Sequence, residues 1–203
     1  MLNLKNKHIK YSKKEKVYIN HITQTPGEHW KIATNDMKAL KNKIMRHLLS
    51  MQNERCAYCK SRLDVGGRSE IEHIAPKGRE LYPEFSFNEY NLVLACQNCN
   101  GSSKKGFKNI VQKHSKHYRR CKFYIVHPYM NNSNHHYIWA NGIEIVIIAG
   151  TPKADFSITM FKLNSPHLTE QRAMELLKEK HRQSAGLTIQ ERETIDNAIS
   201  HFD

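Results

Sequence analysis

The sequence of 203 residues predicts an α+β fold, and three observations support this class. Apolar residues recur at helical spacing between positions 35 and 52. Two short segments, 70–74 and 91–95, have the length and pattern of strands and border turn or loop residues. The last third of the chain has short strand patterns followed by two helical ones. Separate strand and helix runs of this kind are typical of α+β proteins.

The first element in chain order is a lysine-rich segment, 1–34, which we predict either to touch phosphates or to form a solvated, partly ordered end. We favour the solvated end, because termini fray unless they are docked. A helix is predicted to follow over 35–52, with Asp36 suited by its charge to the first turn. One face of this helix is apolar and consists of Met37, Leu40, Ile44, Leu48 and Met51.

The helix leads into the first of two cysteine pairs, Cys56/Cys59 and Cys96/Cys99. Two residues between thiolates allow one tight turn to present both sulfurs to a tetrahedral ion, so the four cysteines predict one structural zinc. The long gap between the pairs indicates that the ion joins two parts of a larger unit. This usage suits a reducing compartment, and we expect a cytoplasmic protein. The fifth cysteine, Cys121, is either a low-pKa thiol or, as we favour, a bystander.

Between and after the cysteine pairs the chain has the segments EIEHIAPKG, NLVLAC and CNGSSKKG, which contain Glu72, His73, Asn91 and Asn100. These segments resemble the HNH endonucleases, whose ββα-metal core is a β-hairpin and a helix around one divalent ion. The resemblance implies strands at EHIAP and NLVLAC and a motif helix from Asn100 onwards. Asn100 stands where many members have histidine, a variant that the family tolerates. One extra residue after Asn100 leaves open whether Lys104 or Lys105 is the family's lysine.

The resemblance implies a metal-dependent endonuclease that hydrolyses phosphodiester bonds. A histidine with a near-neutral pKa can take a proton from water, and we assign this role to His73. The oxygens of Glu72 and Asn100 suit Mg²⁺ or Mn²⁺, and such an ion acts as a Lewis acid. By the same resemblance, Asn91 orients His73 and fixes the loop. Because neighbouring residues face opposite sides of an ideal strand, we expect the backbone to bend or end at Glu72 and His73.

The charge balance indicates a polyanionic partner. Lysine and arginine number 32 against 19 acidic residues, a net charge of +13, and nucleic acid is the commonest partner of such proteins. We expect DNA, although the sequence does not distinguish it from RNA. The spacing of Phe107, Ile110, Val111 and His114 predicts a helix after the motif. The basic residues around it would either contact phosphates or be merely solvated. They are Lys104, Lys105, Lys108, Lys113, Lys116, Arg119 and Arg120.

The C-terminal part is predicted to begin with four strands, at 123–126, 137–139, 143–149 and 157–161, with a hairpin turn at Asn141-Gly142. Two helices follow. Ser165 and Pro166 favour the start of the first, and Thr188 with Glu191 forms a capping box for the second. The second helix has an apolar stripe of Ile195, Ala198, Ile199 and Phe202. We therefore expect a basic segment 1–34, a nuclease core 35–122, and an extension 123–203 packed on the core.

The extension carries a second resemblance. HPYMNN and a pattern of Leu163-Asn164, Leu168 and Arg172 resemble HNH proteins of Septu-type bacterial anti-phage systems, in which an HNH subunit works beside an ATPase. This implies a defence role and an ATPase partner. No apolar run is long enough to span a bilayer, so no membrane partner is expected. Two alternatives stay open, a non-cleaving zinc module that binds nucleic acid and a zinc-stabilised protein-interaction domain.

Overall fold

The computed structural model describes residues 1–24, 29–64, 67–78, 81–183 and 186–200. The chain divides into two compact units, Met1–Asn132 and Ser133–Asp203. This division lies ten residues beyond the boundary expected at 122/123, so the HPYMNN segment is part of the first unit. Among the described residues, no helix is long and apolar enough to cross a membrane.

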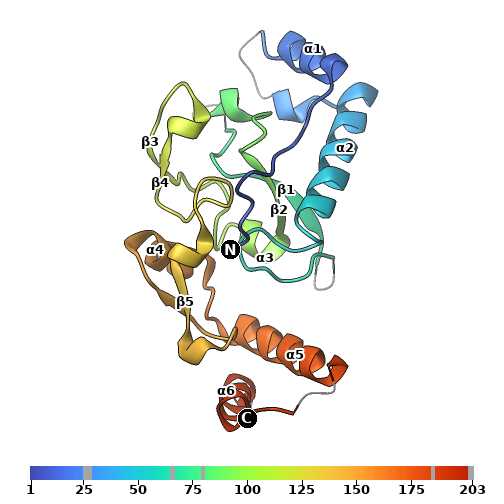
Figure 1. Ribbon diagram of the computed structural model, residues 1–203. Helices are drawn as coiled ribbons and strands as arrows, with labels where there is room; N and C mark the ends of the chain where they lie inside the picture. The colour runs from blue at the N-terminus through green and yellow to red at the C-terminus, as the bar shows by residue number, and fades with distance from the viewer. Residues whose placement is uncertain (25–28, 65–66, 79–80, 184–185, 201–203) are drawn as a thin grey trace. The chain divides into compact units, whose positions relative to one another are not determined.

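The first unit combines helices with two small antiparallel sheets (Figure 1). Its elements, in chain order, are α1 (Lys13–Ile22), η1 (His29–Lys31), α2 (Asn35–Met51), β1 (Ser69–His73), η2 (Pro83–Phe85), β2 (Leu92–Cys96), α3 (Gln97–Asn100), β3 (Val111–Lys113), η3 (Tyr118–Arg120) and β4 (Lys122–Phe123). Both strands of the expected hairpin are confirmed within one residue. They pair antiparallel with Ser69 opposite Cys96 and His73 opposite Leu92.

Helix α2 is confirmed, and it supports the hairpin. Its N-cap Thr34 accepts a hydrogen bond from Met37 N, and its buried residues are Met37, Leu40, Ile44 and Leu48. Just beyond its end, the buried amide of Gln52 donates to Leu94 O at 3.0 Å and accepts from Leu94 N at 2.8 Å. Gln52 therefore pairs with β2 as a neighbouring strand would, which satisfies backbone groups that would otherwise be buried without partners.

The N-terminal residues are docked, so the expectation of a solvated end is wrong for them. Met1, Leu4 and Ile9 are buried, and the backbone N–H of Leu2 donates to Ala57 O at 2.9 Å. Helix α1, which follows, starts with a capping box between Ser12 and Glu15. The docking shows that apolar residues among the lysines hold this segment in place, a pattern too sparse for periodicity to reveal.

The helix predicted from Asn100 onwards is also wrong. Helix α3 spans Gln97–Asn100 and ends where that helix was expected to begin. Residues 102–107 form turns, and the basic stretch continues as β3, η3 and β4. Gly106 has a φ of +44°, a left-handed conformation that interrupts a helix and favours glycine. Ile110 and Val111 are buried as expected, whereas Phe107 is 82% exposed.

The second unit contains a hairpin and three longer helices. Its elements are η4 (Ser133–His135), β5 (Tyr137–Trp139), η5 (Ala140–Gly142), β6 (Ile147–Ala149), α4 (Pro152–Phe161), α5 (Pro166–Arg182) and α6 (Ile189–Ile199). Strand β5 matches its prediction, but β6 is shorter than the predicted 143–149. Asn141 and Gly142 do turn with positive φ, of 54° and 73°, inside a loop longer than a two-residue hairpin turn.

The strand predicted at 157–161 is wrong, because these residues lie in α4. Thr151 caps that helix by accepting from Ala154 N, and Pro152 occupies its first turn. The starts of α5 and α6 are confirmed, the latter with its capping box. Of the predicted stripe on α6, Ile195 and Ala198 are buried, Ile199 is 37% exposed, and Phe202 lies outside the described residues.

The pattern around Leu163-Asn164 is structural in this unit. The Asn164 side chain accepts from Ile147 N at 2.9 Å and donates to Ile147 O at 2.7 Å. The Arg172 guanidinium donates to the carbonyls of Ile145 and Leu163. The Asn164 bonds join the turn before α5 to β6. The Arg172 bonds join α5 to that turn and to the residues before β6, so these polar side chains connect the parts of the second unit.

Candidate active site and metal centre

The four paired cysteines gather at one end of the hairpin. Their sulfurs all lie within 4.8 Å of one another, with Cys56 and Cys59 after α2, Cys96 at the end of β2 and Cys99 in α3. All four are free thiols. Cys56, Cys59 and Cys99 are buried and Cys96 is half-buried, and thiolates gathered so closely would be costly without a cation. The cluster is therefore positioned to bind a metal ion, as the sequence predicted.

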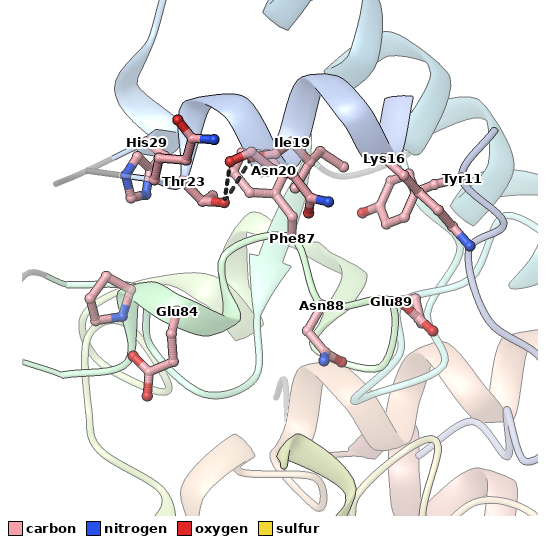
Figure 2. A pocket seen from close by; sticks show the side chains of 12 residues that line it. Tyr11, Lys16, Ile19, Asn20, Thr23, His29, Glu84, Phe87, Asn88 and Glu89 are labelled. Atoms are coloured by element: carbon pink, nitrogen blue, oxygen red, sulfur yellow. Dashed lines mark hydrogen bonds between the residues drawn. The ribbon is translucent and has the colours of Figure 1, made fainter. Parts of the chain in front are cut away.

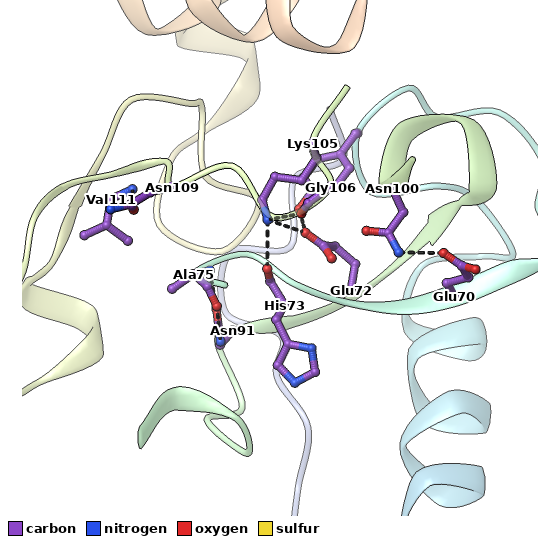
Figure 3. Close-up of polar contacts among 11 residues, drawn as sticks. Glu70, Glu72, His73, Ala75, Asn91, Asn100, Lys105, Gly106, Asn109 and Val111 are labelled. Carbon is purple, nitrogen blue, oxygen red and sulfur yellow. Dashed lines mark hydrogen bonds and ion pairs between the residues drawn. The ribbon is translucent and has the colours of Figure 1, made fainter. Parts of the chain in front are cut away.

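Glu72, in β1, is buried against a cation. Its Oε1 lies 2.8 Å from Lys105 Nζ, and the side chains are 8% and 1% exposed. Tyr58 OH donates to the same oxygen at 3.4 Å. Burial raises the pKa of Glu72, although Lys105 acts in the opposite direction. Of the two candidate lysines, Lys105 is the one that pairs with Glu72 (Figure 3).

His73 points to the opposite side of β1 from Glu72 (Figure 3). Its Nε2 lies 3.0 Å from Ser86 O. A carbonyl oxygen can only accept, so Nε2 carries the proton and Nδ1 is left as a base. Nδ1 is buried without a hydrogen-bond partner among the described residues. Burial lowers the pKa of His73 well below its usual value, with Lys77 acting in the same direction, so the ring is neutral.

The His73 ring is enclosed. It is 2% exposed. It packs against the Trp30 indole in a T-shaped arrangement, with the ring planes at 86° and the ring centroids 4.5 Å apart. Lys41 holds Trp30 in turn, because its Nζ donates to Trp30 O at 2.6 Å. Trp30 lies far from the motif in sequence and was not predicted, since no spacing rule relates it to His73.

Asn91 fixes the loop that faces His73. Its side chain accepts from Ala75 N at 2.6 Å and donates to Ala75 O at 3.1 Å and Phe85 O at 2.9 Å. Phe85 precedes Ser86, whose carbonyl holds His73. In the described part of the chain no hydrogen bond joins Asn91 to His73, so Asn91 is linked to the histidine through this loop.

Asn100 lies at the end of α3, and its Nδ2 donates to Glu70 Oε2 at 2.6 Å. Glu70 and Glu72 are two residues apart in β1 and so share one face of the strand. The structure thus brings Asn100 and Glu72 to one side of β1 and leaves His73 on the other (Figure 3). The strand ends at His73, but its side chains still alternate, so the expected convergence of Glu72 and His73 is not seen.

The basic residues divide into two groups. Lys104 and Lys105 are buried, whereas the remaining members of the predicted set are exposed, namely Lys108, Lys113, Lys116, Arg119 and Arg120. Arg119 also lies over the Tyr90 ring at 5.0 Å. Only the exposed group is free to meet a polyanion.

Burial raises the pKa of Cys121, which contradicts the low-pKa alternative for this thiol.

A buried network behind the loop was missed by the sequence analysis. Tyr118 OH and His127 Nε2 are 2.9 Å apart, and Tyr129 N donates to His127 Nδ1 at 3.2 Å. Tyr129 OH donates to Leu92 O at 2.6 Å, at the start of β2. The HPYMNN motif that supplies His127 and Tyr129 thus holds the hairpin in place, and its histidine-proline-tyrosine run was the available clue.

A cavity of about 740 Å³ lies elsewhere in the first unit, between α1 and the segment that contains η2 (Figure 2). Its lining includes Tyr11, Ile19 and Phe87 but neither Glu72 nor His73. The Tyr11 hydroxyl is buried there without a hydrogen-bond partner among the described residues. This cavity is therefore separate from the residues that the sequence singled out.

Comparison with known proteins agrees with this geometry. Residues 56–106 match the model of the HNH endonuclease family, so the hairpin, α3 and the cysteine cluster form an HNH domain. The chain is 29% identical over 157 residues to Septu protein PtuB of Bacillus mycoides (strain KBAB4), covering 67% of this chain and 52% of that protein. It is 45% identical over 60 residues to Septu protein PtuB of Bacillus thuringiensis, covering 29% of this chain and 22% of that one.

A phage protein is also similar. Protein ea31 of Escherichia phage lambda is 29% identical over 121 residues, or 56% of this chain and 34% of the phage protein. The chain thus spans about half or less of the length of these curated relatives. The resemblance to HNH endonucleases and to Septu proteins is confirmed.

Proposed function

We propose that this chain is a metal-dependent endonuclease that hydrolyses phosphodiester bonds in nucleic acid, with DNA as the expected substrate. The proposal is supported by the HNH domain at 56–106 and by the buried His73 within it. We further propose a role in anti-phage defence in the cytoplasm, beside an ATPase partner. The similarity to Septu proteins supports this role, although the chain spans only about half of the longer-matched relative.

The observation that carries the proposal is the state of His73. Its Nε2 proton is committed to Ser86 O, so Nδ1 is unprotonated and without a partner among the described residues. A neutral imidazole with a free ring nitrogen can take the proton from an attacking water, which at His73 requires the ring, 2% exposed here, to become accessible when substrate binds. A purely structural histidine in a core usually has both ring nitrogens satisfied, as His127 does here.

A hard divalent ion fits the other side of β1. Glu72 and Asn100 provide a carboxylate and an amide oxygen, the ligand types that Mg²⁺ and Mn²⁺ prefer. Lys105 already pairs with Oε1 of Glu72, so an ion at this carboxylate would have to bind beside the ammonium or displace it. Such an ion, when bound, would supply Lewis-acid stabilisation of the scissile phosphate and the leaving oxygen. We assign the ion of the four-cysteine cluster as structural Zn²⁺, because tetrahedral thiolate sites are typical of zinc.

The exposed basic residues are proposed to bind the phosphate backbone. Lys108, Lys113 and Lys116 follow the HNH domain, and Arg119 and Arg120 lie in η3. Contacts of this kind position a nucleic acid without selecting its sequence. Lys104 and Lys105 leave this set, because buried ammonium groups do not reach a backbone in solvent.

The test is a cleavage assay on supercoiled plasmid, single-stranded DNA and RNA, with Mg²⁺, with Mn²⁺ and without divalent ions. We expect His73→Ala to lose about 10²–10⁴-fold in rate while it keeps its zinc and its affinity for nucleic acid. Asn100→Ala should lose activity that high Mn²⁺ or Mg²⁺ partly restores. His21→Ala, which changes an exposed histidine of α1, is the matched control and should cleave normally.

The alternatives predict different outcomes in the same assay. A non-cleaving binding module would shift nucleic acid in a gel and leave every substrate intact. A protein-interaction domain would do neither. Cleavage by His73→Ala at the wild-type rate would rule out His73 as the base, and the activity would then belong to another group or to a contaminant.

A further inference from the structure

Phe107 is the most exposed of the large hydrophobic residues that the structure describes. Its exposed fraction is 82%, and the next are Ile189 at 80% and Val17 at 69%. It directly follows Gly106, at the end of the turn that connects α3 to the basic stretch. Burying a phenylalanine side chain is worth about 1.5–3 kcal/mol, and the fold does not gain this stabilisation at Phe107.

The turn that presents Phe107 is anchored in the candidate active site. Lys105 Nζ binds Glu72 Oε1 at 2.8 Å, His73 O at 3.2 Å and Gly106 O at 3.3 Å. Lys108 N donates to Lys105 O at 2.9 Å, which closes the turn on the far side of Phe107. Phe107 is therefore an exposed ring on backbone that is fixed on both sides, next to Glu72.

Gly106 adds a second constraint on this turn. Its φ of +44° lies in the left-handed region, and a Cβ there would come within 3.0 Å of Ser102 Cα. The backbone thus folds back on itself immediately before Phe107, in a conformation that glycine allows and other residues rarely adopt. The backbone that carries Phe107 is therefore constrained at Gly106, and the ring that it carries is exposed.

The surroundings of Phe107 favour a flat, negatively charged ligand. Lys108 is exposed beside it in sequence, Lys113 follows on β3, and the chain carries a net charge of +13. A ring on a basic surface matches the two features of single-stranded nucleic acid, in which phosphates meet lysines and bases stack on aromatic side chains. A paired, fully stacked duplex offers no free base face to such a ring.

We propose that Phe107 stacks on an unpaired base of the nucleic acid next to the candidate active site, so that single-stranded or locally opened nucleic acid is the preferred substrate. The inference rests on the proposed function and adds to it a substrate class and a residue that selects it. Loss of one base–aromatic contact costs enough to weaken binding by about 5- to 150-fold.

The experiment measures binding rather than cleavage, in a His73→Ala background so that the probe stays intact. The probes are a short single-stranded DNA with 2-aminopurine at successive positions and the duplex of the same sequence. Phe107→Ala should weaken single-strand binding by about 5- to 150-fold and abolish the fluorescence change of the contacted base. Phe107→Trp should retain both, and Val17→Ala, on α1, should change neither.

The outcomes separate the two hypotheses. If the parent protein binds the probe and Phe107→Ala binds it equally well, the stacking role is wrong while the nuclease proposal stands. Equal affinity of the parent for duplex and single strand would also overturn the inference. If the parent binds neither probe, the proposed function fails and the stacking role fails with it.

Discussion

Lys105 and Glu72 form an ion pair inside the protein, with Nζ 2.8 Å from Oε1 and side chains that are only 1% and 8% exposed. Lys105 comes from the turn after α3, and Glu72 is the penultimate residue of β1. The pair therefore fastens this turn to β1. It also places a positive charge beside a carboxylate that we propose as a metal ligand.

We predict that Lys105→Met strongly destabilises the protein. Removing one partner of a buried ion pair typically costs about 3–5 kcal/mol, because the other charge is left uncompensated. Urea unfolding would measure this cost. The double variant Lys105→Met with Glu72→Gln should regain much of the loss, since no buried charge is left. Lys108→Met is the matched control on an exposed neighbour, and a Lys105→Met protein as stable as this control would contradict the prediction.

Cys96→Ser is predicted to remove the structural zinc and most of the folded state. A closed zinc site contributes its binding free energy directly to folding, and Cys96 joins β2 to the other three cysteines. Metal analysis and thermal unfolding would report the loss together. Cys121→Ser should keep a full complement of zinc, because Cys121 lies outside the cluster. Well-folded wild-type protein without stoichiometric zinc would disprove the assignment.

Asn91→Ala is predicted to lower both stability and cleavage. The side chain is fully buried and bonds Ala75 twice and Phe85 once. Each buried group that loses its partner costs about 1–3 kcal/mol, and the loop that carries Ser86 would no longer hold His73. Unfolding and nicking should be measured at a temperature where the variant is still folded. Asn109→Ala, an exposed change, is the control.

Reversing Lys108, Lys116 and Arg119 to glutamate is predicted to weaken binding to all sequences alike. Each lost phosphate contact should reduce the slope of log K against log salt by about 0.9 for duplex DNA or 0.7 for a single strand. Fluorescence anisotropy over a salt series would measure the slope. An unchanged affinity at low salt would show that this surface does not face nucleic acid.

Local patterns predicted the centre of the fold well. The cysteine spacing and the apolar NLVLAC run are confirmed. The apolar face of α2 is confirmed except for Met51, which is only half-buried. Each of these signals depends on residues close in sequence or on a strict period. Capping residues were equally informative, because Thr188 and Glu191 satisfy the first backbone N–H groups of α6 by themselves. These signals are local in cause and so can be recognised in one sequence.

Other elements depend on contacts between residues far apart in the sequence, which hydrophobic periodicity does not reveal. Ile110 and Val111 fit a helical stripe, yet the left-handed Gly106 precedes them, and Val111 begins strand β3 with Ile110 just before it. Ser157 to Phe161 has β-branched residues typical of strands, but the helix cap at Thr151 decides their structure. In the candidate site, the residue types were predictable, whereas Trp30, Ser86 and Lys105 reach His73 and Glu72 only through tertiary folding.

The two ends of the β1–β2 hairpin are held by different means. At one end Cys96, opposite Ser69, is tied by the cysteine cluster, and at the other Leu92, opposite His73, follows the loop anchor Asn91. Local opening in native proteins starts where restraints are weakest. Chelation of the zinc proposed for this cluster should therefore accelerate amide hydrogen exchange first at the Cys96 end, while protection near His73 is lost only when the Asn91 hydrogen bonds break.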